Sequence, residues 1–563
     1  MMFLPTTKSE VQKLGWDRPD IILISGDTYI DSPFIGISVI GNYLSKKGFK
    51  TAIIAQPDIK TGDIARLGEP NLFWGVSAGA MDSLISNWTA LNKFRNDDDL
   101  TPGGINNRRP DRATIVYTNL IRRYFKNTKP IVLGGMEASL RRIVHYDFKD
   151  DALRRSILFD AKADILIYGM GEKTSFELAS RLKEKKDWRD INGLCFISKE
   201  KGTDGFEIPS FQDCVKDKNI FFEAFKNFYD NSTSENEKVL YQKQTDRYLV
   251  HNPRWKNLTT EELDEIYDLD FTREVHPFYA KIGKVKAQDT IKFSITSHRG
   301  CFGECNFCAI AVHQGKEVVS RSEKSIIKEA QKIAKQKDFK GYISDLGGPT
   351  ANMFESKCKI NVNAGKCSNK SCLFPQTCSN LIFGHKKQTE LLEKIKNIPD
   401  VKKVFVSSGI RYDMVCADKE NGFNYLKNIA DNNISGQMKV APEHCDKKVL
   451  ALMGKPQIKS LTDFIDMFNK VRGKQFLTYY FIAAYPGCGQ KEMLVLKNFI
   501  EKNIKISPEQ VQIFTPTPST KATLMYYVQK DMFGNEIFVE KDRNKKQYQK
   551  NCLQIKNYGR IHK

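Results

Sequence analysis

The sequence predicts an α/β protein built from two successive parts, a Rossmann-like N-terminal domain and a partial (β/α)6 barrel. Two observations lead to this prediction. Within residues 20–183, apolar runs that end in glycine alternate with segments of helical periodicity. From residue 290 onward, six further strand-like runs alternate with helical segments. Strands that alternate with helices favour parallel sheets covered by helices.

The length of the chain agrees with more than one domain. At 563 residues it exceeds a typical single domain, so two or three are expected. We place the N-terminal domain at 1–185 and the barrel at 286–525, with a connector at 186–285. A cysteine-rich insertion at 351–385 interrupts the barrel, and a charged C-terminal tail occupies 526–563.

The N-terminal region opens with a strand, a helix and a second strand. Residues 20–26 form an apolar run, 35–46 have an amphipathic helical pattern, and 51–55 form the next apolar run. This order implies a right-handed parallel crossover. Further elements of the same sheet are expected as strands at 72–77, 130–135 and 163–169 and as a helix at 172–183.

The region after residue 290 contains the six strand–helix steps of the predicted barrel. The strands are expected at 291–297, 341–346, 402–408, 436–441, 476–485 and 510–516. The helices between them are expected at 323–338, 386–397, 420–432, 458–472 and 490–503. Parallel α/β folds gather their chemistry at the carboxyl ends of the strands, so we expect the site there.

A short loop after the first barrel strand carries three closely spaced cysteines. Cys301, Cys305 and Cys308 follow the spacing C-x3-C-x2-C. Three thiolates on one loop can hold three irons of a cubane cluster and leave the fourth iron open. Gly300 and Gly303 allow the backbone to wrap closely around such a cluster. The alternatives are a structural zinc site and three unrelated buried thiols, but zinc normally takes four ligands and this loop offers three.

Composition bears on the compartment and the partners. Of 13 cysteines, seven lie between residues 301 and 378, which favours metal ligation over disulfides. The chain has no apolar run of about 18 residues and no signal-peptide core, so we expect a cytoplasmic protein with no membrane partner. The formal charge of +21 is compatible with RNA binding or with lysines spread over solvated surfaces.

The cysteine loop, with Phe307 before its last cysteine, resembles the cluster loop of the radical S-adenosylmethionine (SAM) enzymes. The resemblance implies that a [4Fe–4S] cluster binds to the three cysteines and that SAM binds to the open iron. It also implies SAM contacts at the strand ends, for which the candidates are Gly347, Gly348, Ser407, Arg411 and Glu443.

Two details qualify the SAM contacts that the resemblance implies. Arg411 suits a bidentate contact to a carboxylate, and the Ser407 hydroxyl suits ribose or carboxylate bonding. In the family a glutamate often follows the paired glycines, whereas Pro349 stands here. This departure leaves Asp345 as a candidate partner for the SAM ammonium group.

A second group of cysteines lies in the insertion. Its spacing is C-x8-C-x4-C-x5-C, and its members are Cys358, Cys367, Cys372 and Cys378. Four thiols among Asn, Lys, Gly and Ser cannot form much hydrophobic core, and metal binding would fold such a segment. Three interpretations remain open: an auxiliary iron–sulfur cluster, a structural zinc ion, or free thiols.

The N-terminal region resembles the cobalamin-binding-like Rossmann domain of several radical SAM families, through Leu-Gly-Gly at 133–135 and Gly-Met-Gly-Glu at 169–172. The motif D-x-H-x-x-G, which supplies an axial ligand to cobalt in one cobalamin class, is absent. The corresponding stretch is 26–31. We therefore expect a scaffold or a substrate-contacting domain rather than a cobalamin site.

Longer sequence motifs point to one group within this superfamily. Over roughly residues 1–540 the chain resembles the YgiQ-type radical SAM proteins, also called UPF0313. The motifs lie at 297–305, 313–316, 320–322, 345–353, 439–444 and 514–518. The resemblance implies reductive cleavage of SAM to methionine and a 5′-deoxyadenosyl radical, with a reductase, flavodoxin or ferredoxin as electron donor. It names no substrate, and RNA is one candidate. The alternative is a non-catalytic iron–sulfur or zinc protein that binds nucleic acid.

Overall fold

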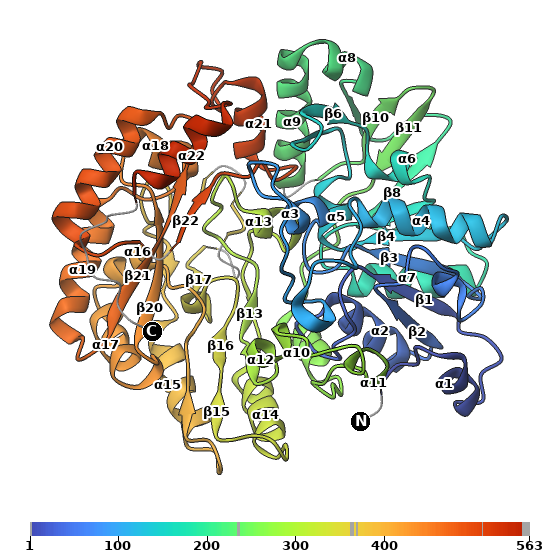
Figure 1. The fold of residues 1–563 in the computed structure, drawn as a ribbon, viewed down its shortest axis with the longest axis horizontal. Coiled ribbons are helices and arrows are strands. Elements are labelled where there is room, and N and C mark those ends of the chain that lie inside the picture. Colours follow the sequence, from blue (N-terminus) through green and yellow to red (C-terminus); the bar gives the residue numbers. More distant parts are fainter. Residues whose placement is uncertain (1–2, 234–236, 361–364, 368–369, 509, 554–563) are drawn as a thin grey trace. The chain divides into compact units, whose positions relative to one another are not determined.

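The structure, a computed structural model, describes residues 3–233, 237–360, 365–367, 370–508 and 510–553. The chain divides into two compact units (Figure 1). The first unit consists of Met1–Lys256, Glu265–Lys292 and Thr517–Ser519. The second consists of Asn257–Asp264, Phe293–Pro516 and Thr520–Lys563.

The first unit is built on a nine-stranded mixed sheet. Its order is β2-β1-β3-β4-β7-β8-β11-β10-β9, and the strands from β2 to β7 pair in parallel. Strand β8 pairs antiparallel with β7, which ends the parallel part. The bounds are β1 Ile21–Ser25, β2 Thr51–Ala55, β3 Phe73–Ser77, β4 Ile131–Gly134, β7 Ile165–Ile167, β8 Leu194–Ser198, β9 Phe206–Ile208, β10 Leu240–Gln244 and β11 Arg247–His251.

Helices cover the parallel part of this sheet. Helix α2 (Gly36–Lys46) connects β1 to β2, whereas α4 (Ala113–Tyr124) connects β3 to β4 in the opposite direction along the sheet. Right-handed crossovers in opposite directions put their helices on opposite faces. The other elements are α1 Lys8–Lys13, α3 Ser83–Asn87, α5 Gly135–Leu140, β5 His145–Asp147, β6 Ala152–Arg154, α6 Ile157–Ala161, α7 Glu172–Lys183, α8 Phe211–Lys216, α9 Lys218–Thr233, α10 Thr260–Tyr267, α11 Pro277–Ala280 and α12 Ala287–Ile291.

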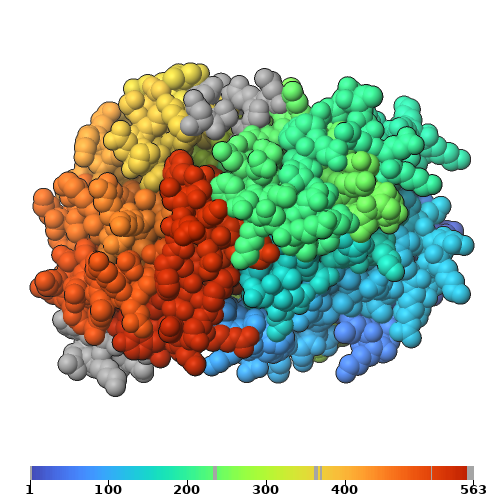
Figure 2. Space-filling model, turned by 90° about the horizontal axis from the view of Figure 1, so that it is seen from above, coloured from blue at the N-terminus to red at the C-terminus, as the bar shows by residue number. Residues whose placement is uncertain are grey.

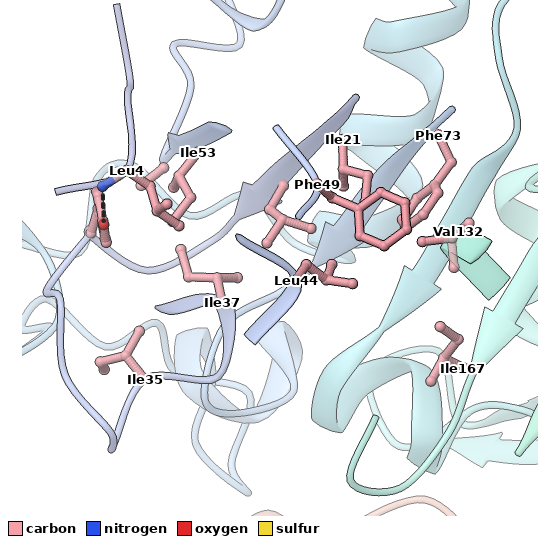
Figure 3. Packing of buried hydrophobic residues seen from close by; sticks show 14 of the residues in the cluster. Leu4, Ile21, Ile35, Ile37, Leu44, Phe49, Ile53, Phe73, Val132 and Ile167 are labelled. Carbon is pink, nitrogen blue, oxygen red and sulfur yellow. Dashed lines mark hydrogen bonds between the residues drawn. The ribbon is translucent and has the colours of Figure 1, made fainter. Parts of the chain in front are cut away.

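The core between α2, α7 and the sheet is apolar. Leu44 from α2, Ile21 from β1 and Ile53 from β2 belong to one buried cluster, members of which Figure 3 draws as sticks. Leu178 of α7 belongs to the same cluster. The predicted strands and helices of residues 20–183 are therefore confirmed, because their apolar side chains meet in one core.

The stretch 186–285, expected as a connector, adds four strands to the large sheet instead. Strands β8 and β11 pair antiparallel, as do β10 and β11. The apolar alternation that predicts a strand is absent from β10, because β10 buries two polar side chains, Gln242 and Gln244. Gln242 Oε1 accepts from the Val144 amide at 3.1 Å, and Gln244 Oε1 accepts from the Ser156 amide at 2.9 Å.

In the second unit, strands alternate with helices in the expected order, and the pairs among them that join successive steps are parallel. Strands β12 and β16 pair in parallel, as do β15 and β19, β20 and β21, and β21 and β22. The ladder extends beyond β19, because the Phe405 amide donates to Ile343 O and the Leu346 amide to Phe405 O, both at 2.9 Å. The bounds are β12 Ser294–Thr296, β15 Tyr342–Ile343, β16 Asp345–Gly347, β19 Lys403–Val404, β20 Gln437–Glu443, β21 Phe476–Ala483 and β22 Gln510–Ile513.

The helices of the second unit begin close to the predicted positions. Two end in π-helical segments, Ile429–Asn433 after α17 and Ile500–Ile504 after α20. In the space-filling view, the residues coloured yellow to red gather in one continuous mass (Figure 2). The bounds are α13 Ala309–His313, α14 Glu323–Ala334, α15 His385–Lys396, α16 Tyr412–Ala417, α17 Gly422–Asn428, α18 Lys447–Met453, α19 Lys459–Val471, α20 Gln490–Phe499, α21 Lys521–Val528 and α22 Arg543–Asn551.

The C-terminal segment, expected as a charged tail, contains α22 and packs on the unit. Gln549 is fully buried and accepts from the Ala484 amide at 2.9 Å, and Lys546 donates to the Tyr526 hydroxyl at 2.8 Å. Residues 554–563 lie outside the described residues. In the part of the chain that the structure describes, no helix has the length and apolar character needed to cross a membrane.

Candidate active site

The cysteine loop begins immediately after β13 (His298–Arg299), which pairs antiparallel with β14 (Val319–Ser320). Gly300 turns the chain here with a φ of 79°, a left-handed conformation that favours glycine. A Cβ atom on Gly300 would also overlap the carbonyl oxygen of Glu317. The start of the loop therefore requires glycine for two independent reasons.

The residues between the second and third cysteines anchor the loop to neighbouring helices. The Asn306 amide donates to Met453 O at 2.9 Å, and its carbonyl oxygen accepts from the Ala522 amide at 2.8 Å. Phe307 packs edge-to-face on Tyr485, with ring centroids 6.2 Å apart. The loop is thus fixed against the segments that follow β20, β21 and β22.

Arg411 approaches the loop from the segment after β19. Its Nη1 donates to Cys305 Sγ at 3.5 Å, while Nε and Nη2 donate to both carboxylate oxygens of Asp413 at 2.8 and 2.6 Å. A Cβ atom on Gly303 would lie 2.7 Å from Arg411 Nη1 and 3.4 Å from Cys301 Sγ. Gly303 therefore leaves the space in which a guanidinium and a thiol sit side by side.

The Arg411–Asp413 pair is electrostatically strong. Burial opposes the ionisation of both groups, yet the pKa of Asp413 is held below its usual range by Arg411. Arg411 therefore presents Nη1 to the cysteines, while Asp413 occupies the face formed by Nε and Nη2. The remaining N–H groups of Arg411 keep the contact with a ligand carboxylate as a prediction.

A second polar group joins Asp345, at the start of β16, to the segment that follows β19. Asp345 Oδ1 accepts from the amides of Ser407 and Ser408 at 2.8 and 3.1 Å, and Oδ2 accepts from the Ser408 hydroxyl. The Ser407 hydroxyl donates to Ser344 O at 2.8 Å. Burial raises the pKa of Asp345, and the serine hydrogen bonds act against that rise.

The paired glycines follow directly in β16. Gly347 O accepts from the Ser297 amide at 2.7 Å and from its hydroxyl at 3.0 Å. A Cβ atom on Gly348 would lie 2.5 Å from the His298 ring. Gly347 and Gly348 therefore bring β16 close to the strand that leads into the cysteine loop.

Glu443 ends β20 and has a φ of 69°, an uncommon left-handed conformation for a residue other than glycine. Burial raises its pKa, while Lys455 and Arg411 lower it. Lys455 is itself buried and donates to Ala441 O at 2.6 Å. Glu443, Lys455 and Arg411 therefore form a mixed-charge group at the strand ends.

The three thiols of the loop lie near one another and are partly buried. Burial, together with the neighbouring thiols of Cys305 and Cys301, raises the pKa of Cys308 to about 12. Burial and Cys305 also raise the pKa of Cys301. A metal centre that binds here would displace the thiol protons, since thiolate is the ligating form. Donor number and chemistry fit a [4Fe–4S] cluster with one open iron.

The four cysteines of the insertion line a single cavity. Burial raises the pKa of Cys372 to about 11, and the neighbouring thiols of Cys378, Cys367 and Cys358 add to this rise. Across the described residues, no three His, Cys, Asp or Glu side chains converge closely enough to hold one metal ion. The described residues include all 13 cysteines, and none forms a disulfide.

Sequence reasoning missed three residues of this site. Asp413 orients Arg411, Asn306 anchors the cysteine loop, and Lys455 lies near Glu443. Asp413 could have been found from the sequence, because opposite charges two residues apart, at Arg411 and Asp413, suggest a salt bridge. The other two depend on contacts between distant segments and have no local signal.

Comparison with known proteins identifies the family. The chain is 53% identical to a UPF0313 protein of Fusobacterium nucleatum over 567 residues, which cover 100% of both chains. The chain belongs to the UPF0313 family of radical SAM enzymes. It is also 47% identical to the UPF0313 protein of Thermotoga maritima, over 99% of this chain and 100% of that protein. Residues 3–294 match the family model "Radical SAM N-terminal".

Solved structures extend the likeness at the level of the fold. The radical SAM methyltransferase TsrM of Kitasatospora setae, solved with cobalamin and a [4Fe–4S] cluster, aligns at a TM-score of 0.50 and 13% identity over 92% of this chain and 83% of its own. The cobalamin-dependent SAM radical enzyme OxsB, solved with aqua-cobalamin, aligns at a TM-score of 0.50 and 12% identity. The alignment covers 92% of this chain and 57% of OxsB. The UPF0313 chain thus shares an α/β fold with a large mixed sheet.

Proposed function

We propose that this UPF0313 protein binds a [4Fe–4S] cluster through Cys301, Cys305 and Cys308 and cleaves SAM reductively. When bound, the cluster and SAM supply one-electron cleavage to methionine and a 5′-deoxyadenosyl radical, which takes a hydrogen atom from substrate. The observation that carries the proposal is the close approach of Arg411 to Gly303 and Cys305 of the cysteine loop. Such a loop, fixed before any metal binds, suits a centre with an open coordination position.

The residues at the strand ends would then bind and orient SAM. Glu443 and Lys455 offer opposite charges near Arg411, which suits the ammonium and carboxylate groups of an amino acid. Ser407 and Gly348 remain candidate contacts for the rest of SAM. Asp345 is engaged by two serine amides, so we assign it the role of holding the strand ends together.

We propose that the second unit is the partial (β/α)6 barrel that houses this chemistry, and that the first unit is the Rossmann-like domain. The alternation of strands and helices between residues 294 and 513, with four parallel strand pairings, supports the first assignment. The helix-covered parallel strands β2 to β7 support the second. We place the boundary where the units separate, at Lys292 and Phe293.

We propose that the first unit binds no cobalamin, although TsrM and OxsB were solved with one. Asp27, at the carboxyl end of β1, is buried and forms an ion pair with Arg109 at 2.7 Å. Thr28 is fully buried and donates to Gln56 at 3.0 Å. Because these buried side chains already have bonding partners at the end of β1, we propose that the unit is a scaffold or contacts substrate.

Incubation with hydroxocobalamin tests this assignment. After gel filtration, we expect no corrinoid absorbance with the protein. An Asp27→Ala variant serves as the comparison, since it removes the carboxylate that pairs with Arg109 at the end of β1. Stoichiometric corrinoid on the unaltered protein would contradict the assignment.

The proposal also covers the substrate and the electron donor. RNA is compatible with the net charge of +21, and a flavodoxin, ferredoxin or reductase would supply the electron. The direct test of the function uses anaerobic reconstitution, dithionite reduction and detection of 5′-deoxyadenosine. We expect product from the unaltered protein and none from Cys305→Ala. No product from either protein under several reductants would refute the proposal.

A further inference from the structure

We propose that the insertion binds a second [4Fe–4S] cluster, ligated at all four irons by Cys358, Cys367, Cys372 and Cys378. This site is separate from the cysteine loop and goes beyond the cleavage of SAM. The first observation is the cavity itself, because four thiols from 21 residues of chain line its wall together. Thiols distributed around a cavity suit a multi-atom cluster, whose four corners each need one thiolate.

The backbone of the insertion brings three of these cysteines together by short-range hydrogen bonds. Strand β17 (Lys357–Cys358) pairs antiparallel with β18 (Leu381–Ile382), with Cys358 opposite Leu381. The Cys378 amide donates to Cys372 O at 2.8 Å, and the Leu381 amide donates to Cys378 O at 3.0 Å. The segment therefore closes on itself at its two ends.

The fourth cysteine is fixed from outside the insertion. Lys316 is buried and its Nζ donates to Cys367 O at 2.6 Å. Lys366 and Lys370 also line the cavity. A cubane with four thiolate ligands carries net negative charge, and three lysines around it would offset that charge.

The hydrophobic support of the insertion is small. Between residues 358 and 382, its buried members of a core cluster are Cys372, Leu373 and Leu381. Much of the remaining segment is polar, so apolar burial alone supplies little stability. Metal binding would supply the missing stability, because the free energy of metal ligation adds to the free energy of folding.

The same core cluster joins the insertion to the cysteine loop. Phe302 belongs to it, and Cys301 packs against it. A Cβ atom on Gly365 would lie 3.1 Å from Phe302 Cβ and would overlap the carbonyl oxygen of Lys316. The insertion is therefore packed against the residue that follows the first cysteine of the loop, and the two metal sites are neighbours within the second unit.

The test counts iron, sulfide and zinc in three anaerobically reconstituted proteins. The unaltered protein should hold about eight irons and eight sulfides. The triple variant C301A/C305A/C308A should keep about four of each. The double variant C358S/C378S should also keep about four. Cys358 and Cys378 are chosen because Cys372 lies in the core, where its replacement would disturb packing.

Control variants and a spectroscopic measurement separate this inference from the proposed function. Cys416→Ser, outside both cysteine groups, should keep all the iron. The reduced triple variant should give an electron paramagnetic resonance signal of a [4Fe–4S] cluster that does not change on addition of SAM. A triple variant without iron, or one zinc ion per chain lost only in C358S/C378S, would overturn the second cluster. Loss of deoxyadenosine formation with eight irons still bound would instead refute the proposed function alone.

Discussion

The two cysteine groups of the second unit differ in how the chain holds them. The loop with Cys301, Cys305 and Cys308 is fixed by distant segments, through Asn306 to Met453 and Ala522 and through Arg411 to Cys305. The insertion is held mainly by itself, through β17, β18 and the hydrogen bond from Cys378 to Cys372. The loop is organised by the fold, whereas under our proposal the insertion depends on the cluster that it would bind.

This difference suits two kinds of metal centre. A centre that binds a substrate-like molecule at an open iron needs neighbours in defined positions, which the strand ends supply. A fully ligated cluster needs its four thiolates and little else, so a short polar insertion suffices. The predictions below test this contrast, from the largest expected effect to the smallest.

Gly300→Ala should abolish iron binding at the cysteine loop. The left-handed φ costs about 1–2 kcal/mol for a residue other than glycine, and the new Cβ overlaps Glu317 O in addition. The matched control is Gly315→Ala, where φ is 90° and nothing lies within 4 Å of the added Cβ. The control should keep its iron. Equal iron loss in both variants would show that the left-handed φ alone, without the overlap with Glu317 O, prevents iron binding.

Removal of iron should expose the insertion to protease before it exposes the loop. We expect tryptic cleavage near Lys357, Lys359 or Lys370 to accelerate at least about tenfold after chelation. Cleavage at Arg299 should change little, because that side chain is buried and precedes an anchored loop. Mass spectrometry of timed digests measures both sites. Equal acceleration at both would mean that the two groups depend on metal alike.

Asp413→Asn should weaken SAM binding by about 10- to 100-fold, the range expected for loss of a charge-assisted hydrogen bond. The substitution removes the carboxylate that holds Arg411 Nε and Nη2, so Nη1 is no longer directed at Cys305. Asp463→Asn is the control, since its ion pair with Lys459 is exposed. Equilibrium dialysis with SAM measures both. Unchanged affinity in Asp413→Asn would exclude this positioning role.

Much of the fold was predictable, because the parallel strands of both units carry short apolar runs bounded by helices. Strand β10 was not, because Gln242 and Gln244 are buried there in place of apolar residues. Helix α22 was not, because its buried side uses Lys546 and the Gln549 amide. In both cases hydrogen bonds between distant segments replace the apolar contacts on which pattern reading depends.

The candidate site was predictable only where spacing itself carries the chemistry. The C-x3-C-x2-C spacing and the paired glycines Gly347 and Gly348 are visible in the sequence. The pairing of Arg411 with Asp413, and the packing of Gly365 beside Phe302, arise from the tertiary fold. The cavity lined by the four insertion cysteines likewise appears only when the segment is folded.

The central claim is that one cysteine group leaves an iron open to SAM and the other does not. Electron paramagnetic resonance of the reduced protein tests it most directly, with and without SAM, in the C358S/C378S and C301A/C305A/C308A variants. The account predicts that SAM shifts the signal of the first variant and leaves that of the second unchanged. A SAM-dependent shift in the second variant, or none in the first, would contradict it.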